Sequence, residues 1–288
     1  MKPRTIAIIQ ARMSSSRLPG KVLLDIGGEP MLARVVERAL CAKLVDQVIV
    51  ATTTDPSDDP IAEFCAERGY NFTRGSLNDV LDRYYQAARE YEAEIIVRLT
   101  ADCPVLDPDV VDQTIAVIAR NEVTKQSPSM SAETAASREL APRGDMNFDF
   151  VANRLPPPMG RTFPIGLDTE VCTFAALENA WTNATEKHQR EHVMPYLYEG
   201  VNLQTFQHAN LSTGVSQRNF RIALLNHDLD YGALRWTVDT PEDLEFIREI
   251  FGRFNNDDFS WHDILALLDR EPELAKINAD VHHKTLME

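Results

Sequence analysis

The segment Ile8–Asp25 places three cationic side chains in one short polar loop. Its sequence, IIQARMSSSRLPGKVLLD, carries Arg12, Arg17 and Lys21 in an otherwise acidic protein. Backbone N–H groups in a turn that contains Ser and Gly, together with three cations, can cradle a chain of phosphates. The loop has neither the Gly-x4-Gly-Lys-Ser/Thr pattern nor the Gly-x-Gly-x-x-Gly pattern. We therefore predict a nucleoside triphosphate site of another type, with a solvated basic turn as the alternative.

Two aspartates, Asp102 and Asp239, could supply the oxygen ligands for the divalent cation that a triphosphate site needs. Each follows a predicted strand, Ile95–Leu99 before Asp102 and Arg235–Val238 before Asp239. Ligands of open α/β sheets bind at the carboxyl ends of the strands, so both carboxylates can meet the basic loop there. We predict that they hold Mg²⁺. The alternatives are a turn residue for Asp102 and a helix-capping carboxylate for Asp239.

The composition is that of a folded, acidic protein. Of 288 residues, 44% are hydrophobic, and 29 Lys and Arg stand against 44 Asp and Glu, for a formal net charge of −15. This charge opposes nonspecific binding to nucleic acid or to an anionic membrane. The sequence contains no apolar run of about 20 residues and no signal-peptide layout, so we expect a cytoplasmic protein without membrane insertion. The four cysteines form no Cys-x-x-Cys pair, and we expect buried thiols.

Strand-like and helix-like segments alternate along the first hundred residues. Short apolar runs rich in β-branched residues at Thr5–Gln10, Gln47–Thr52 and Glu94–Leu99 suit strands that are covered on both faces. Between them, Pro30–Ala42 and Asn78–Tyr91 place apolar residues on one helical face. This alternation predicts an α/β fold with a mostly parallel central sheet flanked by helices.

The second half of the chain is less regular. We expect strands at Thr169–Phe174, Asn202–Gln207 and Phe220–Leu225, and helices at Ala175–Ala184 and Gln189–Tyr198. A last helix opens at Thr240, whose hydroxyl can cap the helix N-terminus ahead of a proline.

Six motifs resemble those of one family. They are RMSSSRLPGK in the basic loop, RGSLNDVLDR (74–83), VRLTADCPVLD (97–107), PIGLDTEV (164–171), QREHVMPY (189–196) and WTVDTPEDL (236–244). Together they are similar to the bacterial cytidylyltransferases that activate acidic sugars, the CMP-Kdo synthetase and acylneuraminate cytidylyltransferase group. Within that group the chain most resembles the spore coat polysaccharide biosynthesis protein F family. The resemblance implies a nucleotide-diphospho-sugar transferase fold of the GT-A-like Rossmannoid type with a small β-rich arm.

The resemblance also implies an activity. The expected enzyme is a Mg²⁺-dependent cytidylyltransferase that transfers CMP from CTP to an acidic sugar, a nonulosonate or a Kdo-like compound, and releases pyrophosphate for surface polysaccharide biosynthesis. Three alternatives remain open: a sugar 1-phosphate nucleotidyltransferase, a GT-A glycosyltransferase, and a sugar-nucleotide binding subunit without activity.

Individual roles follow from the same likeness. Arg17 and Lys21 would hold the β- and γ-phosphates, and Asp102 and Asp239 match the aspartates that hold magnesium in CMP-Kdo synthetases. Thr52 and Thr53 would face a pyrimidine edge, although these residues do not exclude a purine. The catalytic candidates are Arg17, Lys21 and Asp102, and no general base stands out. The implied nucleotide site comprises Ala11, Arg12, Ser14, Ser15, Arg17, Lys21, Thr52, Thr53, Asp79 and Asp102.

The acceptor region departs from the better-known members of the group. The His-x-Gly-Ile-Tyr type segment of CMP-Kdo synthetases is replaced by Pro164–Glu170, so we expect an acceptor other than Kdo itself. The expected acceptor carries amine or hydroxyl donors and a carboxylate or phosphonate. The candidate acceptor residues are Arg74, Asp168, Glu170, Arg190 and His192. A helix terminus with an Asp79–Arg83 ion pair and, around Arg190, a charged helix face are the alternatives.

We divide the chain into three parts. Residues 1–156 form the nucleotide-binding core and include a mobile insert at 121–146, which is rich in polar and small residues. Residues 157–217 form an acceptor-side and dimerisation arm. Residues 218–288 return to the core with the metal-binding motif and C-terminal helices. Relatives in this group commonly pair through such an arm, so the resemblance implies a homodimer.

Overall fold

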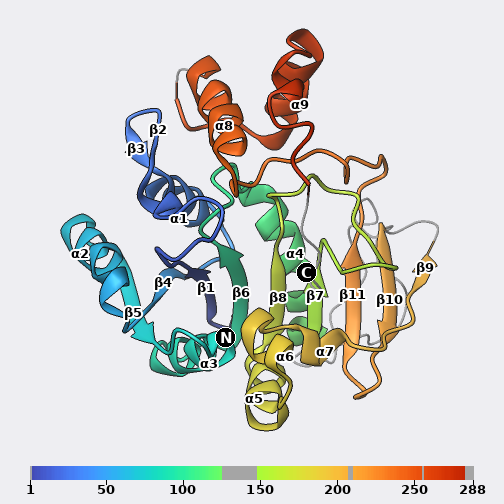
Figure 1. Cartoon of the computed structure of the whole chain (residues 1–288). Coiled ribbons are helices and arrows are strands. Elements are labelled where there is room, and N and C mark those ends of the chain that lie inside the picture. The colour runs from blue at the N-terminus through green and yellow to red at the C-terminus, as the bar shows by residue number, and fades with distance from the viewer. Residues whose placement is uncertain (1, 125–147, 207–209, 255, 283–288) are drawn as a thin grey trace.

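The computed structural model of the chain describes residues 2–124, 148–206, 210–254 and 256–282. Within these residues a nine-stranded sheet has the order β5-β4-β1-β6-β8-β7-β11-β10-β9, and a small antiparallel pair, β2-β3, stands apart from it. Helices cover both faces of the large sheet (Figure 1). The expected α/β class with a mostly parallel central sheet is confirmed.

The elements of the first half follow the predicted alternation of strands and helices. They are β1 (Thr5–Gln10), η1 (Lys21–Leu23), β2 (Asp25–Ile26), β3 (Glu29–Pro30), α1 (Met31–Leu40), β4 (Gln47–Thr53), η2 (Pro56–Asp58), α2 (Asp59–Arg68), β5 (Asn71–Gly75), α3 (Val80–Glu90), β6 (Ile95–Thr100) and α4 (Pro108–Thr124).

The second half adds strands to the same sheet and closes with two helices. The elements are β7 (Phe150–Ala152), β8 (Glu170–Thr173), α5 (Phe174–Asn183), α6 (Lys187–His192), α7 (Pro195–Tyr198), β9 (Gln204–Phe206), β10 (Leu211–Val215), β11 (Arg221–Leu225), α8 (Pro241–Arg253), α9 (Trp261–Arg270) and η3 (Leu274–Lys276). In Figure 1, α8 and α9 lie at the top of the view, and α3, α5, α6 and α7 gather below.

Strand β1 shows why the predicted runs are apolar on both faces. Ala7 and Ile9 belong to a core shared with α1, α4, α8 and α9, whereas Ile6 and Ile8 belong to a core shared with α3, α5 and α7. All four side chains are fully buried. A strand between two helical layers must present an apolar side chain at every position.

Strand direction brings the candidate site residues to one edge. β1 pairs in parallel with β4 and β6, and β4 pairs in parallel with β5. β8 runs antiparallel between β6 and β7. The carboxyl ends of β1, β4 and β6 therefore lie at the same edge, which is where the basic loop and Asp102 begin.

Two predicted elements differ from the structure. Arg235–Val238 forms no strand, because its backbone pairs with Ile165 on one side and Asp102 on the other instead of joining a continuous ladder. The predicted helix Gln189–Tyr198 is split into α6 and α7. The break occurs where Val193 takes a positive φ of 71° and Pro195 has no N–H to continue the helical bonding.

The stretch 157–217 contributes strands to the same sheet as the rest of the chain. β8 lies between β6 and β7, and β10 pairs with β11. The division into three parts stays a prediction. Residues 121–124 belong to the end of α4, and the rest of the predicted insert, 125–146, lies outside the described residues. Among the described residues, we find no helix that is both long and apolar enough to span a membrane.

Candidate active site

A cavity of about 510 Å³ opens at this edge of the sheet and contains most of the predicted phosphate and metal residues. Predicted site residues that line it are Arg12, Ser15, Arg17, Lys21, Asp102, His192 and Asp239. Gln10, Ser16, Val22, Thr100, Ala101 and Glu191 complete the lining. The structure thus brings together side chains that are more than 200 residues apart in the chain.

The basic loop is folded back on itself at Gly20. The N–H groups of Ser15 and Gly20 both donate to the carbonyl oxygen of Met13, each at 2.9 Å. Gly20 has a φ of 71°, in the left-handed region that costs other residues more than glycine. Asp58, which is fully buried, accepts the Met13 N–H at 2.6 Å and the Thr53 hydroxyl, and so ties the loop to the end of β4. The loop is therefore anchored at its start and turns Arg17 and Lys21 toward the cavity.

Lys21 is the centre of the cavity's charge network. Its Nζ donates to Asp102 Oδ2 at 2.8 Å, to Asp239 Oδ1 at 2.9 Å and to the Val238 carbonyl oxygen at 2.7 Å. Burial alone would lower the pKa of Lys21, but the negative charges of Asp102 and Asp239 outweigh burial and raise it. Burial would likewise raise the pKa of Asp102, but the Lys21 ammonium lowers it to about 2. Both partners are therefore charged at neutral pH.

Asp239 is held by two further cations. Its Oδ2 lies 2.8 Å from Arg17 Nη2 and 2.9 Å from Arg235 Nη2. Because Lys21 already takes Oδ1, both oxygens of Asp239 point at positive charge. The side chains that could hold phosphates therefore neutralise the carboxylates that could hold a cation.

The two carboxylates converge on one point in space. A single atom, Lys21 Nζ, sits within 2.9 Å of an oxygen of each. A position between two charged oxygens suits a hard divalent cation, and Mg²⁺ is commonly bound by one or two carboxylates together with substrate phosphates and water. The donor set therefore fits Mg²⁺ at a nucleotide site. Within the described residues, no group of three or more acidic, His or Cys side chains forms a cation site by itself.

A close backbone approach delivers Asp239 to this point. The Trp236 N–H donates to the Ile165 carbonyl oxygen at 2.7 Å, and the Val238 N–H donates to the Asp102 carbonyl oxygen at 2.8 Å. Gly166 allows this approach, because a Cβ there would lie 2.7 Å from the Trp236 carbonyl carbon. Asp239 then precedes α8, where Thr240 and Asp243 form a capping box.

The predicted nucleobase residues are placed beneath the cavity surface. Thr52 and Thr53 are fully buried, and neither lines the cavity.

Arg83 is a residue whose role the sequence left open between a place in the site and an ion pair with Asp79. It is 3% exposed, and its Nε and Nη1 have no hydrogen-bond partner in the described part of the chain. Burial and then the nearby charge of Arg12 lower the pKa of Arg83.

Asp79 and Arg190 pair with each other rather than with the cavity. Arg190 Nε donates to both oxygens of Asp79 at 3.1 and 3.0 Å, and Arg190 Nη1 donates to the Trp181 carbonyl oxygen at 2.7 Å. Asp79 also caps α3 by accepting the Asp82 N–H. The alternative of an Asp79–Arg83 ion pair is not found among the described residues, where Arg190 takes both oxygens of Asp79. These contacts join α3, α5 and α6.

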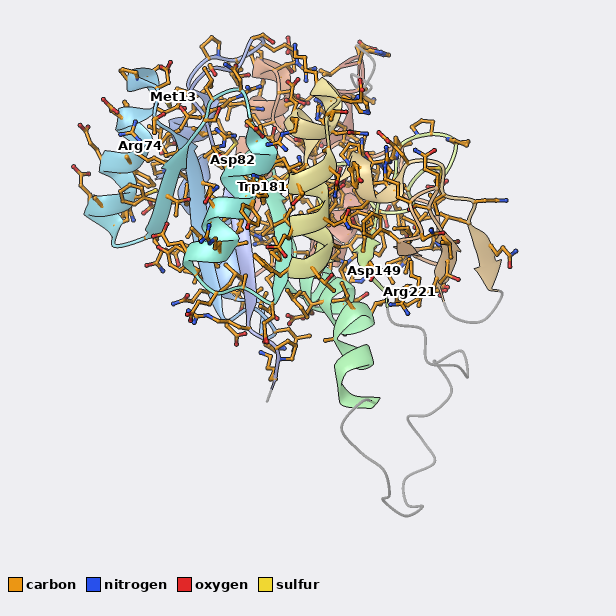
Figure 2. The ribbon with its side chains drawn as sticks, turned by 90° about the horizontal axis from the view of Figure 1, so that it is seen from below. Met13, Arg74, Asp82, Asp149, Trp181 and Arg221 are labelled. Carbon is orange, nitrogen blue, oxygen red and sulfur yellow. The ribbon has the colours of Figure 1, made fainter. Side chains whose placement is uncertain are left out.

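The same three helices carry His192 to the cavity wall. Trp181 on α5 donates its Nε1–H to Asp82 on α3 at 2.8 Å, and its ring stacks on Tyr85. Figure 2 shows Asp82 and Trp181 next to each other between the two helices. His192 ends α6 and faces the cavity.

Arg74 does not line the cavity. Its Nε donates to the Thr53 carbonyl oxygen at 2.7 Å, and its Nη2 pairs with Asp59 at 2.6 Å. It lies on β5, the edge strand of the sheet, as seen at the left of Figure 2. These contacts link β5 to β4 and α2.

Asp168 and Glu170 are engaged with arginines that the sequence did not single out. Arg161 donates to both oxygens of Asp168 at 2.5 and 3.1 Å, and Arg98 pairs with the buried Glu170. Arg154 lies 3.9 Å from Asp168. Burial, and then the positive charges of Arg98 and Arg154, lower the pKa of His192. Three arginines therefore form a cationic cluster near His192: Arg98, Arg154 and Arg161.

The strand pattern contained one signal for this cluster. Arg98 stands in the middle of an otherwise apolar strand, IIVRLT, where a buried charge requires a partner. Its partner, Glu170, is the residue opposite it in the antiparallel pair β6–β8. Because the sequence did not predict that pairing, Arg98 could not be assigned.

Known proteins match the chain over most of its length. Residues 6–260 match the family model described as cytidylyltransferase. The chain is 34% identical over 99% of its length to an uncharacterized protein of Methanocaldococcus jannaschii, of which it covers 98%. It is 27% identical over 93% of its length to the spore coat polysaccharide biosynthesis protein SpsF of Bacillus subtilis, of which it covers 95%. Curated 3-deoxy-manno-octulosonate cytidylyltransferases also match.

A solved structure has the same architecture. A cytidylyltransferase from Leptospira borgpetersenii superposes with a TM-score of 0.74 at 28% identity, and the alignment covers 98% of this chain and all of that one. The family resemblance read from the motifs is thereby confirmed.

Proposed function

The chain belongs to the cytidylyltransferase family, and from that premise we propose that it transfers CMP from CTP to an acidic sugar, a nonulosonate or a Kdo-like compound, and releases pyrophosphate. The observation that carries this proposal is the cavity in which Arg17 and Lys21 face the convergent carboxylates of Asp102 and Asp239. This cavity brings side chains that could bind a triphosphate next to carboxylates that could bind Mg²⁺.

The basic loop would bind the phosphates of CTP. We expect Arg17 and Lys21 to leave the carboxylates when the nucleotide binds and to donate to the β- and γ-phosphates, with Arg12 contacting the same chain. Their charge then stabilises the leaving pyrophosphate while an acceptor oxygen attacks the α-phosphorus. Positioning and charge stabilisation of this kind supply most of the catalysis in phosphoryl-type transfers.

The carboxylates take up the complementary role. Asp102 and Asp239, released by Lys21, would hold Mg²⁺, which when bound supplies charge neutralisation at the α-phosphate. Exchange of partners keeps both carboxylates and both cations satisfied in the free and in the loaded enzyme. Such exchange avoids the penalty of leaving a buried charge unpaired.

Arg83 supports the choice of a pyrimidine. A buried guanidinium with two unpartnered N–H groups carries an unmet demand for acceptors. Cytosine offers O2 and N3 as adjacent acceptors, and Arg83 lies close enough to Arg12, which lines the cavity, to feel its charge. We propose that Arg83 reads the base and that Thr52, whose buried hydroxyl also has no partner in the described chain, contributes to the same contact.

The acceptor would bind on the side of the cavity that His192 lines. Arg154 and its neighbours Arg98 and Arg161 carry three positive charges against Asp168 and Glu170, which leaves one in excess. This excess suits the carboxylate of an acidic acceptor. The lowered pKa of His192 keeps its ring neutral at pH 7, so that it can donate to or accept from an acceptor hydroxyl.

The similarity to the Bacillus subtilis protein supports a role in surface polysaccharide biosynthesis. We also propose that the enzyme works as a cytoplasmic homodimer that pairs through the stretch 157–217. CTP and the acidic acceptor are the small-molecule partners in this proposal, and no nucleic acid is involved.

A pyrophosphate-release screen tests the proposal. CTP, UTP, ATP and GTP are each incubated with Mg²⁺ and with acidic sugars, aminophosphonates or sugar 1-phosphates. Release from CTP with an acidic acceptor supports the proposal, and Arg83→Met should then weaken the preference for CTP. Release only with a sugar 1-phosphate would indicate the nucleotidyltransferase alternative, and nucleotide binding without turnover would indicate a binding subunit.

A further inference from the structure

The C-terminal segment Ile277–His282 reaches back to the active site. Asn278 is 5% exposed, and its Nδ2 donates to Asp243 Oδ1 at 2.9 Å and to the Arg235 carbonyl oxygen at 3.1 Å. Both acceptors lie more than 30 residues earlier in the chain. A buried amide that donates twice to one neighbourhood constrains that neighbourhood strongly.

Asp243 connects Asn278 to Arg235 and to the backbone of Asp239. It is fully buried, and Arg235 donates to its two oxygens through Nε and Nη2, each at 2.9 Å. Its Oδ2 also accepts the N–H groups of Asp239 and Thr240 at 3.0 Å. Asp243 therefore holds the backbone of Asp239 and the guanidinium of Arg235 at once.

Arg235 completes the chain of contacts. Its Nη2 donates to Asp239 Oδ2 at 2.9 Å, so the side chain of Asp239 is oriented from behind while Oδ1 faces Lys21. The sequence of contacts runs from Asn278 to Asp243, then to Arg235, and ends at Asp239. Since Arg235 occupies Oδ2, it fixes which oxygen of Asp239 points to the convergence point with Asp102.

A separate observation places the same segment beside the loop. A second cavity of about 540 Å³ is lined by Arg17, Thr240, Glu242, Ile277, Asp280, Val281 and His282. Arg17 lines the active-site cavity as well and pairs with Asp239. The C-terminal segment thus flanks Asp239 through Asn278 and flanks its partner Arg17 directly.

We propose that Asn278 is a positioning residue for Asp239. The proposal rests on the proposed function, in which Asp239 holds Mg²⁺. Asn278 touches neither substrate nor Mg²⁺. It acts by keeping Asp243 and Arg235 in the one arrangement that presents Asp239 Oδ1 to the cation. Residues that orient a metal ligand typically change metal affinity about 10–100-fold when they are lost.

The test compares two asparagines. Asn278→Ala removes both buried donations, and Asn183→Ala is the matched control, because the amide of Asn183 also donates twice, to Asn179, but on an exposed part of α5. CTP binding is measured by calorimetry over a Mg²⁺ series, with thermal unfolding measured in parallel. We expect the Mg²⁺ concentration for half-maximal CTP binding to rise about tenfold in Asn278→Ala and to stay unchanged in Asn183→Ala.

Each outcome has a defined reading. An unchanged Mg²⁺ midpoint in a folded Asn278→Ala variant, whatever its melting temperature, overturns the positioning role and leaves the proposed function intact. If the wild-type protein binds no CTP at any Mg²⁺ concentration, the proposed function and this inference fail together. Should Asn278→Ala not fold, Asn278→Leu, which removes both donations but keeps a side chain of similar size, is measured in its place under the same criterion.

Discussion

At the scale of single residues, the site depends on Lys21, because one ammonium group separates two carboxylates that would otherwise face each other. Lys21 is 7% exposed, so its ammonium group is largely shielded from water. The same group is the best placed donor for the β- and γ-phosphates. Loss of Lys21 therefore removes a contact from both the free and the loaded enzyme.

We expect Lys21→Ala to abolish most turnover. Removal of one preorganised donor typically costs about 2–4 kcal/mol of transition-state stabilisation. Pyrophosphate release at saturating CTP and Mg²⁺ measures this loss, and Lys2→Ala, a change at an exposed lysine paired with Asp46, is the control. Wild-type turnover in Lys21→Ala would remove the basic loop from the mechanism.

The carboxylates permit a test of the shared cation. Asp102→Asn and Asp239→Asn should each raise the Mg²⁺ requirement and lower turnover, because hard cations prefer charged oxygen ligands. Their effects should not add in the double variant, since both act through one ion. If the double variant loses the sum of the single effects at an unchanged Mg²⁺ dependence, the two aspartates do not share an ion.

Acid stability reports on the same pair. The pKa of Asp102 is lowered from 3.8 to about 2, so its ionised form stabilises the fold above pH 3.8, and that stability is lost as the pH falls toward 2. The contribution is on the order of 2 kcal/mol. Urea unfolding between pH 5 and pH 3 should show a shallower loss for Asp102→Asn than for the wild type. Asp269→Asn, on the exposed face of α9, controls for the change in net charge, and an equal slope in all three proteins would contradict the Lys21–Asp102 coupling.

At the scale of elements, the carboxyl ends of β1 and β6 position the site, while Asp239 arrives on a segment that is not a strand. Its placement depends on the pairing of Ile165 with Arg235 and on the absence of a side chain at Gly166. The φ of 111° at Gly166 adds a backbone conformation that other residues rarely adopt.

Gly166→Ala should separate the two segments. A Cβ there meets main-chain atoms of Trp236 and Thr237 within 2.8 Å, which cannot move aside as a flexible side chain could. We expect a loss of stability well above the roughly 1 kcal/mol of an incompatible Gly→Ala change, together with a higher Mg²⁺ requirement. Gly160→Ala is the control in urea unfolding, because its φ of 79° is also positive but no atom lies within 4 Å of its Cβ. Equal losses of stability in the two variants would mean that the positive φ, and not the contact with Trp236, causes the loss in Gly166→Ala.

At the scale of the whole molecule, the net charge of −15 and the cations of the cavity act on different classes of ligand. The net negative charge opposes the binding of anionic polymers, whereas the cavity brings Arg12, Arg17 and Lys21 together for a small anion. Exposed apolar side chains are few in the described residues, and Val215 on β10 is one of them, at 53%.

The proposed homodimer can be tested at Val215. We expect the wild type to sediment at about twice 32.5 kDa and Val215→Asp to shift toward the monomer, since a buried unpaired carboxylate opposes association. Leu40→Asp is the matched control, because Leu40 is also 53% exposed but lies on α1, outside 157–217. Dissociation by Leu40→Asp alone would place the contact on another face, and a monomeric wild type would exclude the dimer.

The sequence by itself determined the elements that have a local signature. Apolar runs predicted β1, β4 and β6 to within a residue or so, because strands buried on both faces need apolar side chains throughout. The composition of the loop after β1 predicts an anion site, and the order of strands places that loop at the edge of the sheet where the cavity opens. Both properties are set by neighbours in the chain.

Only the tertiary structure decided which partner each charged side chain has. Lys21 meets Asp239 across 218 residues, Arg190 takes Asp79 across 111, and Asn278 reaches Asp243 across 35. No periodicity encodes such pairs, because they depend on how twisted strands and packed helices bring distant segments together. For that reason, the sequence named seven of the side chains that line the cavity, whereas Arg98, Asp58 and Asn278 became candidates only once their burial and their neighbours were known.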